Sequence, residues 1–267
     1  MRAYLSLFRV RFINNLQYRA AALGGLSTQL FWGMMLVFIY KAFYNDASDA
    51  GGFSYRQLVT TIWLQQAFLS FVFLYDWDGE LIDMITTGGI SYELCRPVSL
   101  YPIWYAKLLS KRFARGMLRF APVILVALCL PAPYNLSPPQ SLTSFLLFLA
   151  TLLMGLLLLC AISMLIYISI FKTMSPMGSI GIIGVLGEFF AGMTIPIPLM
   201  PLWLQRICMF TPFRWTGDLP FRVYSGHIGV QEAVWGMGVQ ILWIVLLVGI
   251  GAFLMRRVSR LSIVQGG

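Results

Sequence analysis

The chain carries few residues that could do chemistry on their own. Glu188 is the only acidic residue well inside an apolar segment, where burying a charge in a bilayer costs at least roughly 2.5 kcal/mol. An intramembrane enzyme would need convergent polar groups such as paired carboxylates, HExxH or a serine with a base, which Glu188 alone does not supply. His227 has no second histidine or carboxylate at metal-ligand spacing, so we expect a surface side chain and no metal site.

The cysteines and the phosphate-binding motifs give the same result. Four cysteines lie far apart without a CxxC pair, which favours buried thiols over a metal or disulfide site; they are Cys95, Cys129, Cys160 and Cys208. The chain also lacks GxxxxGK[ST], so it cannot hydrolyse ATP by that route. We predict no catalytic residue and no cofactor in this chain.

The composition indicates a membrane protein. Of its 267 residues 59% are hydrophobic and 11% charged, against roughly 25% charged in ordinary soluble domains. Apolar blocks close to the roughly 20 residues that cross a bilayer repeat along the whole chain. The net charge of +9 is divided into clusters beside these blocks, which is typical of membrane loops and not of a nucleic-acid surface. We predict a single all-α integral membrane domain over residues 1–267.

Six apolar blocks predict six transmembrane helices. They cover approximately residues 20–43, 58–75, 117–131, 142–171, 177–193 and 233–255, with Pro122 shortening and kinking the third. Residues 1–19 alternate arginines with an apolar stripe at helical spacing, formed by Leu5, Phe8, Phe12 and Leu16. This pattern predicts an interfacial helix, with a charged tail as the alternative.

Residues 195–227 lie between the fifth and sixth predicted spans and have a different character. Five prolines alternate there with large aromatic side chains such as Trp203 and Trp215. Prolines at this density exclude one straight helix, and the segment is too apolar for a solvated loop. We predict a broken, re-entrant element on the outer side, sheltered by protein.

The positions of lysine and arginine predict the orientation. Four precede the first span, six lie within residues 76–119, one is Lys172, and three follow the last span. With a cytoplasmic N-terminus, 14 of the 19 lie inside, as membrane insertion prefers. We therefore predict that both termini are cytoplasmic.

The longest hydrophilic stretch, residues 76–116, begins with an ordered pattern. Asp78 can cap a helix and Glu80 suits its first turn, while Leu81, Met84 and Ile85 share one face. Two short helices are predicted here. Their apolar side chains either contact a soluble partner or pack back on the bundle, and the pattern alone leaves both possibilities open.

A resemblance to a known family lies in this loop and in the proline-rich segment. Residues 90–99, Ile-Ser-Tyr-Glu-Leu-Cys-Arg-Pro-Val-Ser, resemble the Gly...Glu-Leu-Leu-Arg-Pro-Val motif of ABC-2 type permeases, the membrane subunits of type V ABC exporters. The run from Ala191 to Trp203, followed by Thr211-Pro-Phe213, is similar to that family's segment between its last two helices. Cys95 stands where a leucine is commoner.

The resemblance implies a half-permease. It would pair with a second copy or, preferably, a sister permease, and with two separate ATPase subunits that bind ATP and Mg²⁺. The loop helix would be the coupling helix that docks on the ATPase, with apolar side chains as knobs and charged ones as orienting groups. The residues assigned to this contact are Leu81, Asp83, Ile85, Tyr92, Glu93 and Arg96.

The resemblance further implies an ATP-driven exporter in a bacterial plasma membrane, surrounded by lipid. We expect a hydrophobic or amphipathic cargo, such as a drug, antibiotic, lipid or peptide. The residues assigned to its path are Gln65, Phe68, Phe71, Glu188, Phe189 and Met193. For each of them helix packing or hydrogen bonding between helices is the structural alternative. An intramembrane enzyme or an ion-coupled carrier is the alternative function.

Overall fold

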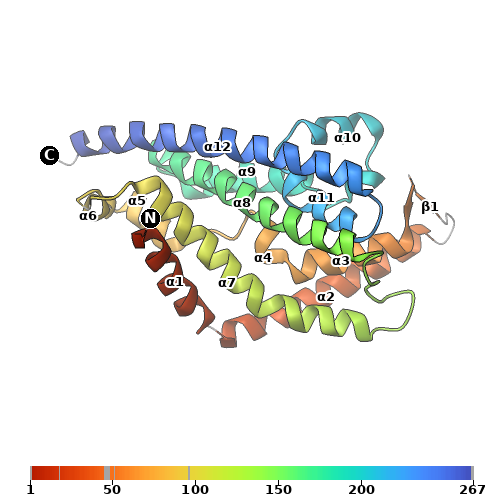
Figure 1. Cartoon of the computed structure of the whole chain (residues 1–267). Coiled ribbons are helices and arrows are strands. Elements are labelled where there is room, and N and C mark those ends of the chain that lie inside the picture. The colour runs from red at the N-terminus through yellow and green to blue at the C-terminus, as the bar shows by residue number, and fades with distance from the viewer. Residues whose placement is uncertain (1, 18, 45–48, 51, 96, 266–267) are drawn as a thin grey trace.

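The computed structural model describes residues 2–17, 19–44, 49–50, 52–95 and 97–265. They form an elongated bundle of helices whose two termini lie at the same end (Figure 1). Beside the helices, the two-residue strands β1 (Asp49–Ala50) and β2 (Phe53–Ser54) pair antiparallel. The chain is thus all-α in character, as its composition predicts.

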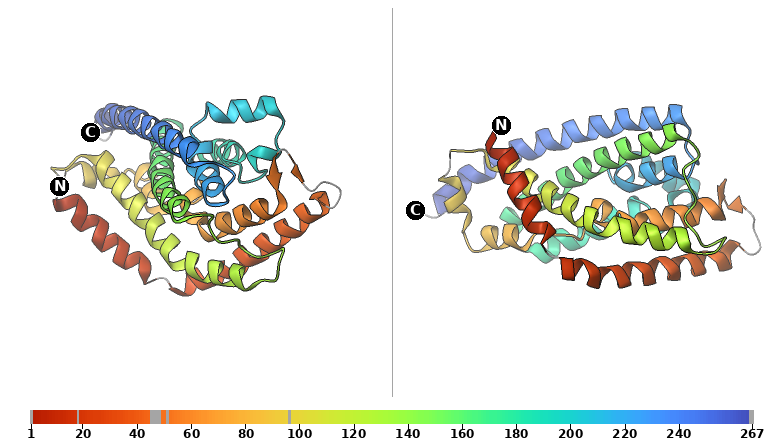
Figure 2. Two further views of the ribbon diagram at one scale, coloured as in Figure 1. Left: turned by 45° about the vertical axis from the view of Figure 1, so that its right-hand side comes forward. Right: turned by 60° about the horizontal axis from the view of Figure 1, so that its bottom comes forward.

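Four predicted spans coincide with helices. They are α2 (Arg19–Tyr44), α8 (Leu142–Thr173), α9 (Pro176–Phe190) and α12 (Val230–Gln265). Among the described residues, three helical stretches are long and apolar enough to cross a membrane: residues 24–44, 142–173 and 230–259. The helix α9 is apolar but shorter. Ahead of α2 lies α1 (Arg2–Leu16), which packs against α7 (Figure 2).

The second predicted span, residues 58–75, needs correction because it is not one helix. It comprises α3 (Tyr55–Ala67) and α4 (Leu69–Val72), with a break at Phe68. A capping box between Ser54 and Gln57 starts α3 three residues earlier than expected. The chain then leaves helical geometry at Phe73.

The third predicted span, residues 117–131, is also wrong at its beginning. The helix α7 (Leu100–Cys129) starts 17 residues earlier and continues through Pro122. Most of the predicted loop 76–116 is therefore helical, with α5 (Gly79–Thr86) and α6 (Ile90–Leu94) preceding α7. The cationic side chains that suggested a solvated loop lie along α7, where carboxylates and carbonyl oxygens bind them.

The proline-rich segment 195–227 is broken, as the prolines predict. It contains the 3₁₀ turn η1 (Ile197–Leu199) and two short helices, α10 (Leu202–Met209) and α11 (Arg214–Tyr224). The first of these helices lies at the side of the bundle, whereas α11 lies within it (Figure 1). Residues 214–221 are all buried.

The helix α8 is the centre of the core. It contacts α7, α9, α11 and α12, and the described side chains from Leu158 to Met164 are all buried. Gly155 permits a close approach of α11, because a Cβ atom there would overlap the backbone of Thr216. Gln240 of α12 donates to the carbonyl oxygens of Thr151 (2.9 Å) and Trp215 (2.7 Å), which ties the three helices together.

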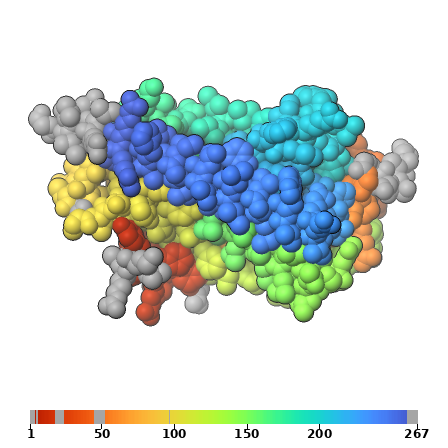
Figure 3. Space-filling view, turned by 45° about the horizontal axis from the view of Figure 1, so that its top comes forward, coloured from red at the N-terminus to blue at the C-terminus, as the bar shows by residue number. Residues whose placement is uncertain are grey.

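The outer faces of α2, α9 and α12 are apolar. On α12, Trp235, Leu242 and Val245 each expose more than half of their surface, and this helix runs along one whole face of the molecule (Figure 3). Exposed Phe31 on α2 and Ile182 on α9 extend the pattern. Such faces match the lipid-exposed or subunit-contacting surface of a membrane protein.

A buried ionic triad stabilises α11. The Asp218 carboxylate lies 3.4 Å from Arg214 and 3.1 Å from Arg222, each one turn away. Asp218 and Arg214 are each 5% exposed, so water screens their charges little. One carboxylate therefore compensates two guanidinium groups inside the protein.

We predict that Asp218→Asn destabilises the folded protein. Removing one partner from a buried ionic group costs about 3–5 kcal/mol, so thermal unfolding in detergent should occur at a clearly lower temperature. Glu232→Gln, at the exposed start of α12, is the matched control and should unfold like the natural protein. Equal unfolding temperatures of the two variants would contradict a stabilising triad.

Candidate functional site

The predicted coupling helices lie at the end of the bundle that also holds both termini (Figure 2). The Asp78 side chain caps α5 by accepting a hydrogen bond from the Glu80 amide (3.0 Å). Gly88, with φ at +77°, then reverses the chain toward α6. We call α5, the turn at Gly88 and α6 the hairpin (residues 79–94). It contacts α7 and α8.

Arg112 binds the segment that joins α4 to this hairpin. Its guanidinium group is buried, with the residue only 1% exposed, and donates to carbonyl oxygens of α4 and of the residues between α4 and α5. The acceptors are Ser70 at 3.3 Å, Phe73 at 2.7 Å and Asp76 at 3.1 Å, with the Ser163 hydroxyl of α8 at 3.3 Å. Four segments are therefore held by one side chain.

The start of α5 is anchored on α8 and α7. The backbone amide of Asp78 donates to the Tyr167 hydroxyl of α8 at 2.6 Å. Lys111 forms an ion pair with the Asp78 carboxylate (3.2 Å) and donates to the Trp77 carbonyl oxygen (3.0 Å). Arg115 pairs with Asp76. These contacts fix the segment between α4 and α5 from two sides.

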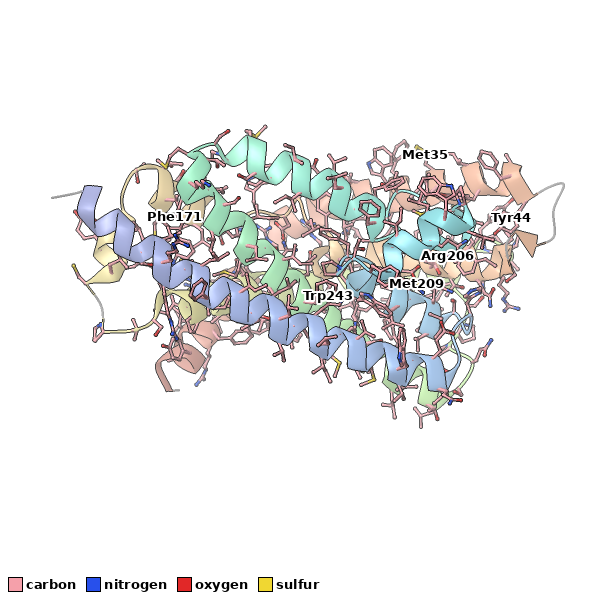
Figure 4. All side chains as sticks on the ribbon, turned by 90° about the horizontal axis from the view of Figure 1, so that it is seen from above. Met35, Tyr44, Phe171, Arg206, Met209 and Trp243 are labelled. Carbon is pink, nitrogen blue, oxygen red and sulfur yellow. The ribbon has the colours of Figure 1, made fainter. Side chains whose placement is uncertain are left out.

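Glu93 joins α6 to α7. Its carboxylate accepts hydrogen bonds from Lys107 (2.6 Å) and from the indole nitrogen of Trp104 (2.5 Å). The Trp104 ring stacks on Phe171, which lies at the far end of α8 (Figure 4), with centroids 5.9 Å apart. Glu93 therefore connects the hairpin to both α7 and α8.

The N-terminal helix α1 contacts the same hairpin. Arg11 donates two hydrogen bonds of 2.6 Å to the Glu80 carboxylate, and these hydrogen bonds lower the pKa of Glu80. The Phe12 and Phe113 rings, 5.9 Å apart, add an apolar contact between α1 and α7. A displacement of α5 would therefore also move α1.

Comparison with protein families shows which family the chain belongs to. The model of the ABC-2 family transporter proteins matches residues 30–262. The chain belongs to this family. It is therefore a membrane permease subunit of an ABC transporter, a class that works with nucleotide-binding ATPase subunits and is not itself an ATPase. No curated protein matches the chain.

The permease places the predicted coupling residues on two sides of the hairpin. Leu81 is fully buried and Ile85 is 4% exposed, so both pack back on the bundle and are not exposed knobs. Asp83 is exposed and Tyr92 is 80% exposed, which leaves them for a partner. Glu93 is engaged within the permease, and Arg96 lies outside the described residues.

The predicted path residues fall into two groups. Gln65 is buried and donates to the Gly192 carbonyl oxygen just beyond α9 (3.2 Å). The Glu188 carboxyl faces the backbone amides of Leu74 and Tyr75, with Oε1 lacking a hydrogen-bond partner among the described residues. The first group is completed by Phe189 and Met193, which are half-buried in the same region.

The second group is an aromatic cluster in the core. Phe68 and Phe71 are buried, and their rings lie within 6 Å of each other and of rings on α7 and α8. The neighbouring rings are Phe113, Phe120 and Phe148. For these two residues the structure thus shows helix packing, which the sequence left as the alternative.

The most connected residues of the permease hairpin were not predicted from the sequence. They are Trp104, Lys107, Lys111, Arg112 and Tyr167. One signal was available, because Lys107, Lys111, Arg115 and Arg119 recur every four residues and so share one helix face.

The other reactive side chains are His227 and the four cysteines. His227 is half-buried, and its ring lies edge-on to Phe53 at 5.0 Å. The cysteines are unpaired, with Cys160 and Cys208 buried as expected but Cys95 and Cys129 exposed. Among the described residues, no three His, Cys, Asp or Glu side chains gather as metal ligands.

We predict that acid separates α1 from α5. Because the pKa of Glu80 is lowered in the fold, its contribution is complete above the unfolded value of about 4.3 and disappears as pH falls through the folded value. Spin labels at exposed Val10 and Thr86, with Cys95 and Cys129 replaced by serine, would report one short distance at pH 7 and a broad distribution once the pH falls below the lowered pKa of Glu80.

Glu80→Gln should show the broad distribution at pH 7 as well, since it removes the charge that Arg11 binds. Glu232→Gln provides the control for the same change elsewhere. A sharp, unchanged distance in Glu80→Gln at pH 7 would mean that other contacts hold α1.

Proposed function

We propose that the chain is the transmembrane half of an ATP-driven exporter for a hydrophobic or amphipathic substrate in a bacterial plasma membrane. Drugs, antibiotics, lipids and peptides belong to this substrate class. Separate ATPase subunits bind ATP and Mg²⁺, and a second permease, preferably a sister chain, completes the route. Family membership over residues 30–262 supports the permease role, and the attachment of the α5–α6 hairpin supports coupling to an ATPase.

In this proposal six segments cross the bilayer. They are α2, α3 with α4, α7, α8, α9 and α12. The helix α7, with 30 residues, is about 45 Å long at 1.5 Å per residue and exceeds a hydrocarbon core of about 30 Å. Its cationic first half therefore extends into the cytoplasm, beside both termini. The distribution of lysine and arginine supports this orientation, and α10 and α11 would form the re-entrant element on the outer side.

The observation that carries the coupling proposal is the way the hairpin is attached. Its outward side presents Asp83, Ser91 and Tyr92. Its inward side is bound to α7 through Glu93 and to α8 through Tyr167, and Arg112 binds the segment that joins the hairpin to α4. An ATPase that closes on ATP and presses on the outward side would displace these helices together. The hairpin would then transmit the movement of the ATPase to the helices of the permease.

The displacement reaches the predicted path through α4. The segment after α4 contacts α9, where the Tyr75 hydroxyl donates to the Gly181 carbonyl oxygen (3.3 Å) and the Tyr75 ring lies against Gly184. Glu188 faces the backbone amide of Tyr75 in this contact, and Gln65 binds the residue just beyond α9. Movement of α4 relative to α9 would therefore change the surroundings of Glu188, which we assign to the substrate path.

Tyr92→Ser is predicted to abolish association with the ATPase and thus transport. Tyr92 presents a large exposed ring on the hairpin, and such rings supply much of the binding energy of protein interfaces. Copurification of the ATPase with the permease, followed by ATP-dependent transport in proteoliposomes, would measure the effect. Phe210→Ser is the matched control, since Phe210 is 83% exposed at the end of α10, a helix that lies far from the hairpin (Figure 1).

Unchanged copurification in Tyr92→Ser would remove the hairpin from the ATPase contact. Ile85→Asp would not serve this purpose, because Ile85 is buried and a charge there would disturb folding itself.

Glu188→Gln is predicted to reduce transport while leaving assembly with the ATPase intact. The carboxyl group is partly buried between α9 and the segment after α4, with one oxygen free of partners among the described residues. Glu232→Gln, the same chemical change at an exposed position, should transport normally. Full transport activity in Glu188→Gln would reduce this residue to a packing role.

A further inference from the structure

A cationic cavity lies between α1, α5 and α7. It has a volume of about 530 Å³, which suffices for a phosphate-bearing headgroup. Five of its lining side chains are cationic and two are neutral amides. The complete lining is Arg11, Asn14, Asn15, Asp78, Glu80, Lys107, Lys111, Arg115, Leu118 and Arg119.

Four of the five cations of this cavity form a stripe on α7. Lys107, Lys111, Arg115 and Arg119 follow one another at four-residue intervals, so like charges repel along one helix face. Three carboxylates near the hairpin, from Glu80, Glu93 and Asp78, bind the two lysines. Asp76 binds Arg115. The carboxylates that bind Lys107, Lys111 and Arg115 thus all come from residues 76–93.

The far end of the stripe reaches the depth at which the first span begins. The guanidinium group of Arg119 lies against Gly25, where an added Cβ atom would be 2.8 Å from it. The first span begins at about residue 20 in the topology proposed above, five residues before Gly25. This end of the cavity therefore lies at the boundary between lipid headgroups and acyl chains in the topology proposed above.

A second, smaller cavity adjoins the first. It measures about 200 Å³ and shares Arg115 and Arg119 with the first. Its remaining lining is Leu69, Ser70, Phe73, Tyr75 and Asp76. The two arginines therefore lie beside the apolar side chains of Leu69 and Phe73 as well as the Asp76 carboxylate.

We propose that this pair of cavities binds an anionic phospholipid of the cytoplasmic leaflet, with the headgroup phosphate at Arg115 and Arg119. Arginine binds phosphate oxygens through paired hydrogen bonds, and Asn14 offers a further amide donor. The site is distinct from the ATPase contact and from the proposed substrate path. Occupation would fasten α1 to α7 and so set the position of the helix that contacts Glu80.

The test is lipid retention by the purified full-length permease without its ATPase. The protein would be incubated in detergent with equal amounts of phosphatidylglycerol and phosphatidylcholine, and bound lipid counted by native mass spectrometry. The proposal predicts preferential retention of phosphatidylglycerol. Asn14→Asp places a negative charge in the cavity at an exposed position, and should reduce that retention by roughly tenfold.

Gln17→Glu is the control variant, because it adds the same charge just beyond α1 at an exposed residue that does not line the cavity. It should retain phosphatidylglycerol like the natural chain. Equal retention of the two lipids, or equal retention by Asn14→Asp and Gln17→Glu, would overturn the proposal. Displacement of the lipid by millimolar inorganic phosphate in place of a lipid preference would also overturn it, since the site would then bind a soluble anion.

Discussion

The structure around the hairpin depends on Arg112, which supplies hydrogen-bond donors to the carbonyl oxygens at the end of α4. A helix that ends within a membrane protein leaves carbonyl oxygens without donors, and each unsatisfied group costs several kcal/mol in an apolar environment. The helix α4 ends at Val72, and the guanidinium group of Arg112 donates to Ser70, Phe73 and Asp76. The helix α4 can therefore end inside the bundle, and the chain continues into the α5–α6 hairpin.

The same principle recurs wherever the chain leaves helical geometry near the core. Gln65 donates to the carbonyl oxygen of Gly192 after α9, and Trp63 donates to that of Tyr134 after α7. At these two places a polar side chain on a neighbouring helix thus replaces a missing backbone donor. These contacts specify positions, whereas the surrounding apolar contacts tolerate sliding.

The sequence predicts those elements whose signal is local. Apolar blocks of membrane length locate α2, α8 and α12, and prolines predict the breaks between α9 and α12. The start of α7 was missed because its lysines and arginines indicate a solvated loop when read alone. Their partners lie elsewhere in the sequence: Asp76 is 39 residues from Arg115, and Glu80 is 69 residues from Arg11. No local pattern contains that information.

The hairpin residues show a further reason why the site was only partly predictable. Helical periodicity correctly groups Leu81 and Ile85 on one face, but it does not say which way the face is turned. Both alternatives bury apolar surface, and the bundle prevails because the hairpin is short and bound on its inner side by Tyr167 and Lys107. The outward face is consequently polar and aromatic, represented by Asp83 and Tyr92. A face of this kind can remain exposed to water, whereas an exposed apolar face would favour aggregation.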